Sequence, residues 1–213
     1  MTINDCNYSP TQYAVQVGGA SGALGSLALG TATQVLTSNG AGANPSFQAN
    51  PNKWIKLSTA TPSNVASVEF KSLIFSSYKT YAVVFNAVKA VSSSDFEMLI
   101  SSDNGSNYSI TNYTSGCWSL TYNSATMINI NSTTHFVVTS GDDGTYGFSG
   151  TVFLFNFGLS AKPSISGQSS VYINYWQNCA GQNTSAATYN AIKFLFATGN
   201  IASGTITLYG IGQ

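Results

Sequence analysis

The stretch Thr151-Val152-Phe153-Leu154-Phe155-Asn156-Phe157 carries large apolar side chains at consecutive positions. Successive side chains of a β-strand point to opposite faces of the sheet, so both faces of a strand here would be apolar. We expect a strand that is covered by a second sheet on one face and by another subunit on the other. No window of helical length in the chain carries an apolar stripe at the helical period.

Strand signals continue through the rest of residues 53–213. The run 81–88 is rich in β-branched and aromatic residues, and Phe96, Met98 and Ile100 alternate with Glu97, Leu99 and Ser101. Further candidate strands are Cys117–Tyr122, Thr126–Ile130, His135–Thr139, Gly150–Phe157, Ser170–Trp176, Ala191–Ala197 and Gly204–Tyr209. The pair Asn104-Gly105 is the strongest short signal for a hairpin, and a second turn is expected at 141–144. Because the five prolines all lie outside these strands, we predict an all-β domain, a β-sandwich or jelly roll of about nine or ten strands.

The first part of the chain, residues 1–52, has a different composition. The run Val17–Gly30 is rich in glycine and alanine, yet hydrophobic residues such as Leu24, Leu27 and Leu29 interrupt it. Such a segment buries little by itself, and a pure linker would not need the hydrophobic residues. We therefore expect an extended, glycine-rich N-terminal anchor that orders against symmetry copies or a larger particle. Asn50-Pro51-Asn52 marks its boundary with the domain 53–213.

Charged residues make up only 7% of the chain, against about a quarter in ordinary proteins. The seven basic residues are all lysines, they are scattered, and the net charge is zero. Nucleic-acid binding needs clustered positive charge, so we expect no nucleic-acid partner. A nearly uncharged surface is typical of a packed oligomer or lattice, and the alternative is a monomer coated with hydroxyls and amides.

Cysteine and histidine are scarce. Three widely spaced cysteines, Cys6, Cys117 and Cys179, form neither a disulfide framework nor a metal pattern, and His135 is the single histidine. Free thiols are expected, in keeping with assembly in a reducing host cytoplasm. We expect no signal peptide at Met1–Pro10 and no membrane insertion, because no apolar run reaches the length of a span.

Seven acidic residues leave few candidates for catalysis. Asp95 with Glu97, or Asp142 with Asp143, could supply the paired carboxylates of a glycosidase, but Asp95 is expected in a loop and the second pair in a turn. Calcium at Asp103 or at Asp142 and Asp143 is an alternative, although no full loop of alternating ligands surrounds them. Nucleophile and phosphate-loop motifs are also missing, so we expect neither an enzyme nor a cofactor.

Aromatic residues beside amides and hydroxyls are typical of sugar-binding surfaces. The candidates for glycan binding are Trp118, Tyr122, Tyr172, Tyr175 and Trp176. The alternative is that these rings fill the sandwich or a subunit interface.

Two stretches resemble virion proteins of bacteriophages. Residues 30–48 resemble the GTxGQVLTSNGAGAxPxWQ element of phage tail-fibre and related proteins, with Thr33 in place of glycine and Phe47 in place of tryptophan. The motif positions are Gln34, Val35, Leu36, Thr37, Ser38, Asn39, Gly40, Pro45 and Phe47. Residues 99–108 and 200–211 are similar to a hairpin and a closing strand of jelly-roll domains at fibre tips or on capsids.

The resemblance implies a non-enzymatic structural protein located in the virion: a fibre, spike or capsid decoration subunit. It implies a homo-oligomer, usually a trimer, in which residues 1–52 dock on other virion proteins and residues 53–213 face outward. The alternative function is a receptor-binding tip module that recognises a host surface glycan, which a concave aromatic cluster at the distal end of the domain would favour. A third hypothesis is a polysaccharide-degrading enzyme. The short length of the chain and its few acidic residues count against it.

Overall fold

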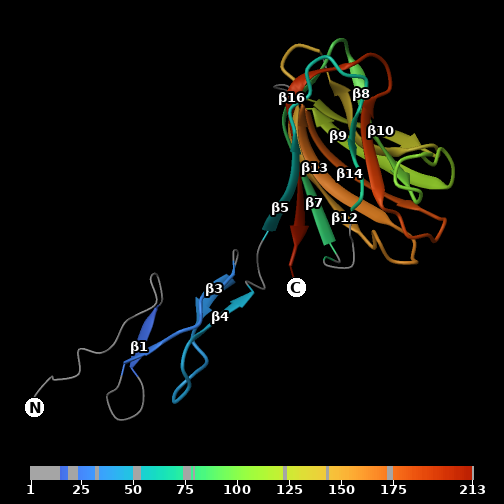
Figure 1. The fold of residues 1–213 in the computed structure, drawn as a ribbon. Coiled ribbons are helices and arrows are strands. Elements are labelled where there is room, and N and C mark those ends of the chain that lie inside the picture. The colour runs from blue at the N-terminus through green and yellow to red at the C-terminus, as the bar shows by residue number, and fades with distance from the viewer. Residues whose placement is uncertain are drawn as a thin grey trace, which may run out of the picture. The chain divides into compact units, whose positions relative to one another are not determined.

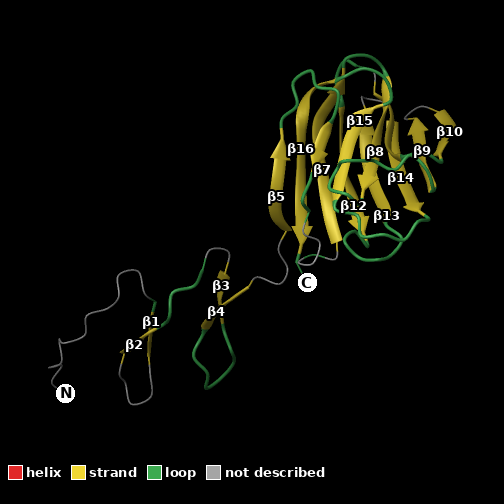
Figure 2. Cartoon of the chain, turned by 45° about the vertical axis from the view of Figure 1, so that its right-hand side comes forward, coloured by secondary structure: helices red, strands yellow, loops and turns green. Residues whose placement is uncertain are grey.

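The computed structural model describes residues 15–18, 24–31, 34–49, 54–73, 78, 80–121, 124–142, 144–171 and 175–212. Within these ranges every regular element is a β-strand, which confirms the predicted all-β class (Figures 1 and 2). The chain divides into two compact units, Met1–Pro51 and Asn52–Gln213. No helix that could span a membrane is found in the part of the chain that the structure describes.

Four short strands form the first unit as two antiparallel pairs. They are β1 (Gln16–Gly18), β2 (Leu24–Ser26), β3 (Gln34–Thr37) and β4 (Ser46–Ala49). Two-stranded ribbons have only marginal stability in water unless something packs on their faces.

The second unit is a β-sandwich of two antiparallel sheets (Figure 2). The larger sheet has eight strands in the order β10-β9-β14-β13-β12-β7-β16-β5, and the smaller has four in the order β11-β8-β15-β6. The strands are β5 (Trp54–Ala60), β6 (Val68–Phe70), β7 (Thr80–Ala90), β8 (Ser94–Ser101), β9 (Tyr113–Thr121), β10 (Ser124–Ser132), β11 (Phe136–Asp142), β12 (Phe148–Phe155), β13 (Ser164–Val171), β14 (Tyr175–Asn183), β15 (Ala191–Phe196) and β16 (Ile201–Ile211). Many neighbours are distant in sequence: β7 pairs with β12 and β16, and β9 pairs with β14.

A cluster of phenylalanine rings joins the two sheets. Phe96 on β8 is fully buried, and its ring centroid lies 5.7 Å from that of Phe85 and 5.1 Å from that of Phe148, both on the larger sheet. On its own sheet it contacts Phe194 at 5.8 Å and Phe196 at 4.7 Å. The alternation expected for residues 96–100 is confirmed, because Phe96, Met98 and Ile100 are all buried.

A buried polar side chain, Gln177, joins the two sheets at another point. Gln177 on β14 is 2% exposed, and its side-chain oxygen accepts hydrogen bonds from the Thr139 hydroxyl at 2.6 Å and the Ser140 amide at 2.8 Å. Its amide group donates to the Ser140 carbonyl at 2.7 Å. Since β11 belongs to the smaller sheet, one glutamine links both sheets with every bond satisfied.

Two local predictions were wrong. The run 170–176 is not one strand: it contains the end of β13 and the start of β14, which pair as neighbours. Asn104 and Gly105 do adopt positive φ of 58° and 81°, but the chain does not return as a hairpin, because β8 and β9 belong to different sheets. Local turn chemistry sets the turn, while the pairing partners are set by the whole sandwich.

We expect Phe96→Ala to lower the free energy of unfolding by about 3 to 5 kcal/mol, because the substitution leaves a cavity among four rings. Chemical denaturation of the full chain measures this. Ile110→Ala is the control: Ile110 is 64% exposed, and its substitution should cost about 1 kcal/mol or less. Equal losses for the two variants would contradict this account of the core.

Gln177→Ala should destabilise by about 2 to 3 kcal/mol, since it leaves the Ser140 amide and carbonyl buried without the partners that Gln177 supplied and the Thr139 hydroxyl with Ser169 alone. Asn178→Ala, at the next and exposed position, should change the unfolding free energy by about 0.5 kcal/mol or less. The same denaturation measurements test both variants. An unchanged unfolding free energy for Gln177→Ala would show that the hydrogen bonds of Gln177 do not stabilise the contact between the sheets.

Candidate functional site

Five neighbouring strands of the larger sheet, β10, β9, β14, β13 and β12, contain no Asp, Glu, Lys, Arg or His. The smaller sheet differs, because it carries charged residues that include Glu69, Glu97 and Lys193. One face of the five strands packs on the smaller sheet. The opposite, outer face is therefore a continuous uncharged surface, and no described strand of this unit forms a third layer over it.

A row of small residues crosses this outer face. Gly116 on β9 lies opposite Ala180 on β14, and Ala180 lies opposite Ser166 on β13. The row ends at Asn131 on β10 and at Phe153 on β12. Three adjacent positions without bulk make a trough that runs across the strands.

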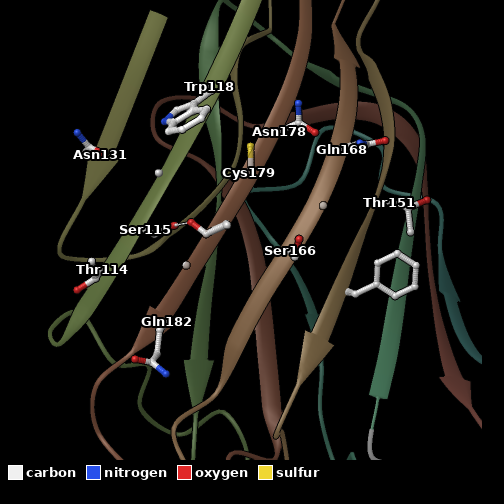
Figure 3. A pocket seen from close by; sticks show the side chains of 15 residues that line it. Thr114, Ser115, Trp118, Asn131, Thr151, Ser166, Gln168, Asn178, Cys179 and Gln182 are labelled. Atoms are coloured by element: carbon white, nitrogen blue, oxygen red, sulfur yellow. Dashed lines mark hydrogen bonds between the residues drawn. The ribbon is translucent and has the colours of Figure 1, made fainter.

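Larger side chains rise on both sides of the trough and make a groove of about 920 Å³ (Figure 3). The next row of the sheet forms one wall, with Trp118, Asn178, Gln168 and Thr151 lying opposite one another in succession. Thr114 and Gln182, also opposite one another, contribute to the other wall. Figure 3 shows Trp118, Asn178 and Gln168 along one side, with Gln182 and Thr114 on the other.

Gly116 has a steric role in the groove. A methyl group there would lie 2.7 Å from the side-chain oxygen of Asn131 and 3.0 Å from the backbone oxygen of Ile130. Both distances are shorter than van der Waals contact, so any other residue would push the Asn131 amide away from the end of the trough.

Four amide side chains line the groove: Asn131, Gln168, Asn178 and Gln182. Asn178, Gln168 and Gln182 are exposed, and within the described residues none of these three makes a side-chain hydrogen bond. Each offers both donors and an acceptor to a ligand. Trp118, 59% exposed, adds a flat apolar surface beside them.

A disulfide lies beneath the groove. Cys117 and Cys179 are directly opposite on β9 and β14, both are buried, and they are bonded to each other. The expectation of free thiols is therefore wrong for these two residues, while Cys6 lies outside the described residues. The two cysteines are 62 positions apart in the sequence, which hides their pairing, because only the register of the sheet brings them together.

Two of the five residues expected to bind glycan lie on the outer face of the larger sheet. Trp118 lines the groove, and Trp176, 61% exposed, lies on the same face as its diagonal neighbour across β9 and β14. Tyr122 and Tyr172 lie outside the described residues, as does the side chain of Tyr175. Gln168, Asn178, Gln182 and Asn131 were not among the residues predicted from the sequence. For Asn178 and Gln182 the sequence did contain a signal, because alternation along a strand places residues 176, 178, 180 and 182 on one face.

The anchor motif forms the β3–β4 hairpin, in which Leu36 lies opposite Phe47. Asn39 holds the loop: its amide donates to the Asn44 carbonyl at 2.7 Å, and its oxygen accepts from the Gln48 side chain at 2.8 Å. The ring of Phe47 sits against Gly30, where a methyl group would lie 2.6 Å from the ring.

The carboxylate candidates are spread over other parts of the sandwich. Asp95 and Glu97 lie in β8, so the loop expected for Asp95 is wrong; its carboxylate accepts from the Gly141 amide at 2.8 Å. Burial, with a contribution from Asp95, raises the pKa of Glu97. Its carboxylate lies 3.5 Å from the ring of His135, whose pKa is lowered by burial.

The other candidates for a metal site also have structural contacts. Hydrogen bonds from Ser101 and Asn107 lower the pKa of Asp103 to about 2 and close the loop around it. The side chains of Asp142 and Asp143 lie outside the described part. No group of three or more His, Cys, Asp or Glu side chains within the described ranges could hold a metal ion.

Comparison with protein-family models, with curated proteins and with solved structures finds no match to this chain.

The raised pKa of Glu97 predicts a pH dependence of stability. The folded state holds the proton more tightly than the unfolded chain, so the contribution of Glu97 to stability falls as the pH rises above the ordinary value of 4.5. The stability of Glu97→Gln relative to the wild type should therefore increase between about pH 4 and pH 7, as measured by urea denaturation.

Glu69→Gln is the matched control with the opposite sign. Burial would raise the pKa of Glu69, but hydrogen bonds and charge from Lys71 and Lys193 outweigh it and lower the pKa. This variant should lose stability relative to the wild type as the pH rises. Parallel slopes for the two variants would contradict both assignments.

Proposed function

We propose that the chain is a non-enzymatic structural protein of a bacteriophage particle, a fibre, spike or capsid decoration subunit. Residues 1–52 dock on other virion proteins, and residues 53–213 form a trimeric β domain on the particle surface. The observation that carries the proposal is the first unit, whose described strands lack a core of their own.

Several apolar side chains of this unit are exposed. Leu29 is 57% exposed, Val35 40% and Leu36 46%, and none of the residues before Pro62 whose burial is described is buried. The loop bonds made by Asn39 stay within the hairpin and fix its shape. A shaped ribbon with uncovered apolar residues is suited to docking on another protein, because burying them there supplies the stability that the ribbon lacks.

An aromatic patch on the sandwich supports the trimer. Trp54 is 44% exposed, and its ring centroid lies 5.8 Å from that of Phe153 and 5.7 Å from that of Tyr209. Phe155, stacked beside Phe153 at 6.4 Å, is 36% exposed. Aromatic residues are enriched in subunit interfaces, and this patch is where the apolar strand 151–157 predicts one.

The disulfide between Cys117 and Cys179 also suits a displayed domain. Disulfides persist in oxidising surroundings, which include virion surfaces. The bond would form after assembly, when the particle leaves the reducing cytoplasm.

The chain should co-purify with phage particles through a density gradient and be labelled on them by antibodies against residues 53–213. A Leu29→Ser, Val35→Ser, Leu36→Ser variant should fall at least about tenfold in copies per particle, since it removes the apolar docking residues. Quantitative mass spectrometry of gradient-purified particles measures the loss.

Ile110→Ser is the control, because Ile110 is 64% exposed but belongs to the second unit; this variant should incorporate normally. Light scattering should give a multiple of the 22.3 kDa chain mass. A chain that stays in the soluble fraction as a monomer and never joins particles would refute the proposal.

A further inference from the structure

The groove over β9, β14 and β13 has a ligand chemistry that assembly does not use. We propose that it binds an uncharged oligosaccharide, which lies along the trough with one sugar ring against Trp118. This binding goes beyond the structural role and does not depend on it.

Trp118 supplies the apolar contact. Its indole is 59% exposed and forms part of one wall of the groove, so a flat apolar ring borders the trough. The carbon–hydrogen face of a sugar ring is apolar and flat, so it can displace water from the indole. An aromatic plane beside a few oriented polar groups is the usual composition of a small-molecule site.

The amides supply the polar contacts. The exposed side chains of Asn178 and Gln168 follow Trp118 in the same wall, and Gln182 faces them from the other side. Within the described residues these three side chains have no hydrogen-bond partner. An amide carries donors and an acceptor, and a sugar hydroxyl can rotate to match either one.

The absence of charge in the groove disfavours anionic ligands. The five strands that form the groove contain no charged residue. A phosphate, a nucleic acid or an acidic glycan would lose water on entry without meeting a positive group. An uncharged polyol pays no such cost, so the neutral lining selects neutral sugars.

The floor sets the direction and length of the ligand. The row Gly116, Ala180 and Ser166 runs across the strands, between Asn131 and Phe153. Five strands at their usual spacing give a trough roughly 19 Å long. This length suits a short oligosaccharide rather than a single sugar.

A second copy of the chain fits the groove less well. Protein interfaces depend on a dry, apolar centre, whereas the centre here is a row of small residues flanked by amides. A flat protein surface would bury these amides, and each unmatched one would cost free energy. The aromatic patch around Trp54 is the apolar part of the same face, so an interface between copies belongs there.

The test measures binding of the full chain to immobilised polysaccharides by biolayer interferometry. The neutral probes are dextran, mannan, galactomannan and xylan, and the acidic probes are alginate and polygalacturonate. We expect binding to at least one neutral polymer and to neither acidic one. Affinity should change less than about twofold between about 0.05 and 0.5 M salt, because no ion pair is involved.

Two variants locate the site. Trp118→Ala should weaken binding at least about tenfold. Ala180→Leu, which removes no polar group and fills the middle of the trough, should do the same. Trp176→Ala is the matched control: it removes an equally exposed tryptophan from the adjacent strand of the same face, outside the lining of the groove, and should change affinity less than about twofold. Thermal melting checks that all three variants fold.

Three results would overturn the assignment: no binding to any neutral polymer, a preference for acidic polymers, or an equal loss for Trp118→Ala and Trp176→Ala. If Ala180→Leu instead abolishes self-association in light scattering, the groove is an interface between copies and the saccharide site is refuted. Incorporation into particles is measured in a separate experiment, so the failure of one proposal does not affect the test of the other.

Discussion

Burial of aromatic rings between the two sheets is the constraint on which the rest of the domain depends. Phe85 and Phe148 from the larger sheet meet Phe96, Phe194 and Phe196 from the smaller one. Because side chains alternate along a strand, turning these rings inward determines the face of every neighbouring residue. The outer face of the larger sheet, with its indole and amides, is a direct consequence of that inward choice.

The interior beneath the groove is built differently. There the hydrogen bonds of Gln177 to Thr139 and Ser140 link the two sheets, and the disulfide of Cys117 and Cys179 joins β9 to β14 within the larger sheet. Directional and covalent links define the register of β9 and β14 more strictly than apolar contacts do. The rows of the groove, which alternate with these buried residues, are thereby held in fixed positions, and a preorganised site loses less entropy on binding.

The two units obtain their stability from different sources. The sandwich has its own core, whereas the β3–β4 hairpin has loop bonds through Asn39 and exposed Val35 and Leu36. A segment of this kind keeps a local shape but gains most of its stability from what it docks on. Under the two proposals, residues 1–52 dock on the particle and the groove on the sandwich binds the ligand, so the docking residues and the groove residues belong to different units.

The class of the fold follows from local features of the chain. Alternation at Phe96, Met98 and Ile100, the apolar run 151–157 and the absence of helical periodicity indicated a β-sandwich, because these signals are local. The sequence also pointed to Trp118 and Trp176 as candidates, since the residue types of a sugar-binding surface can be recognised in a sequence, whereas their exposure comes from the fold.

Contacts between residues that are distant in sequence could not be predicted and became known from the three-dimensional structure. It split the expected strand 170–176 between β13 and β14, led the chain away from the Asn104-Gly105 turn to another sheet, and joined Cys117 to Cys179. It also aligned Gly116, Ala180 and Ser166 into a trough. The physical reason is that strand register is a long-range property: it is set by burying the whole inner face at once, and no local stretch of sequence contains that information.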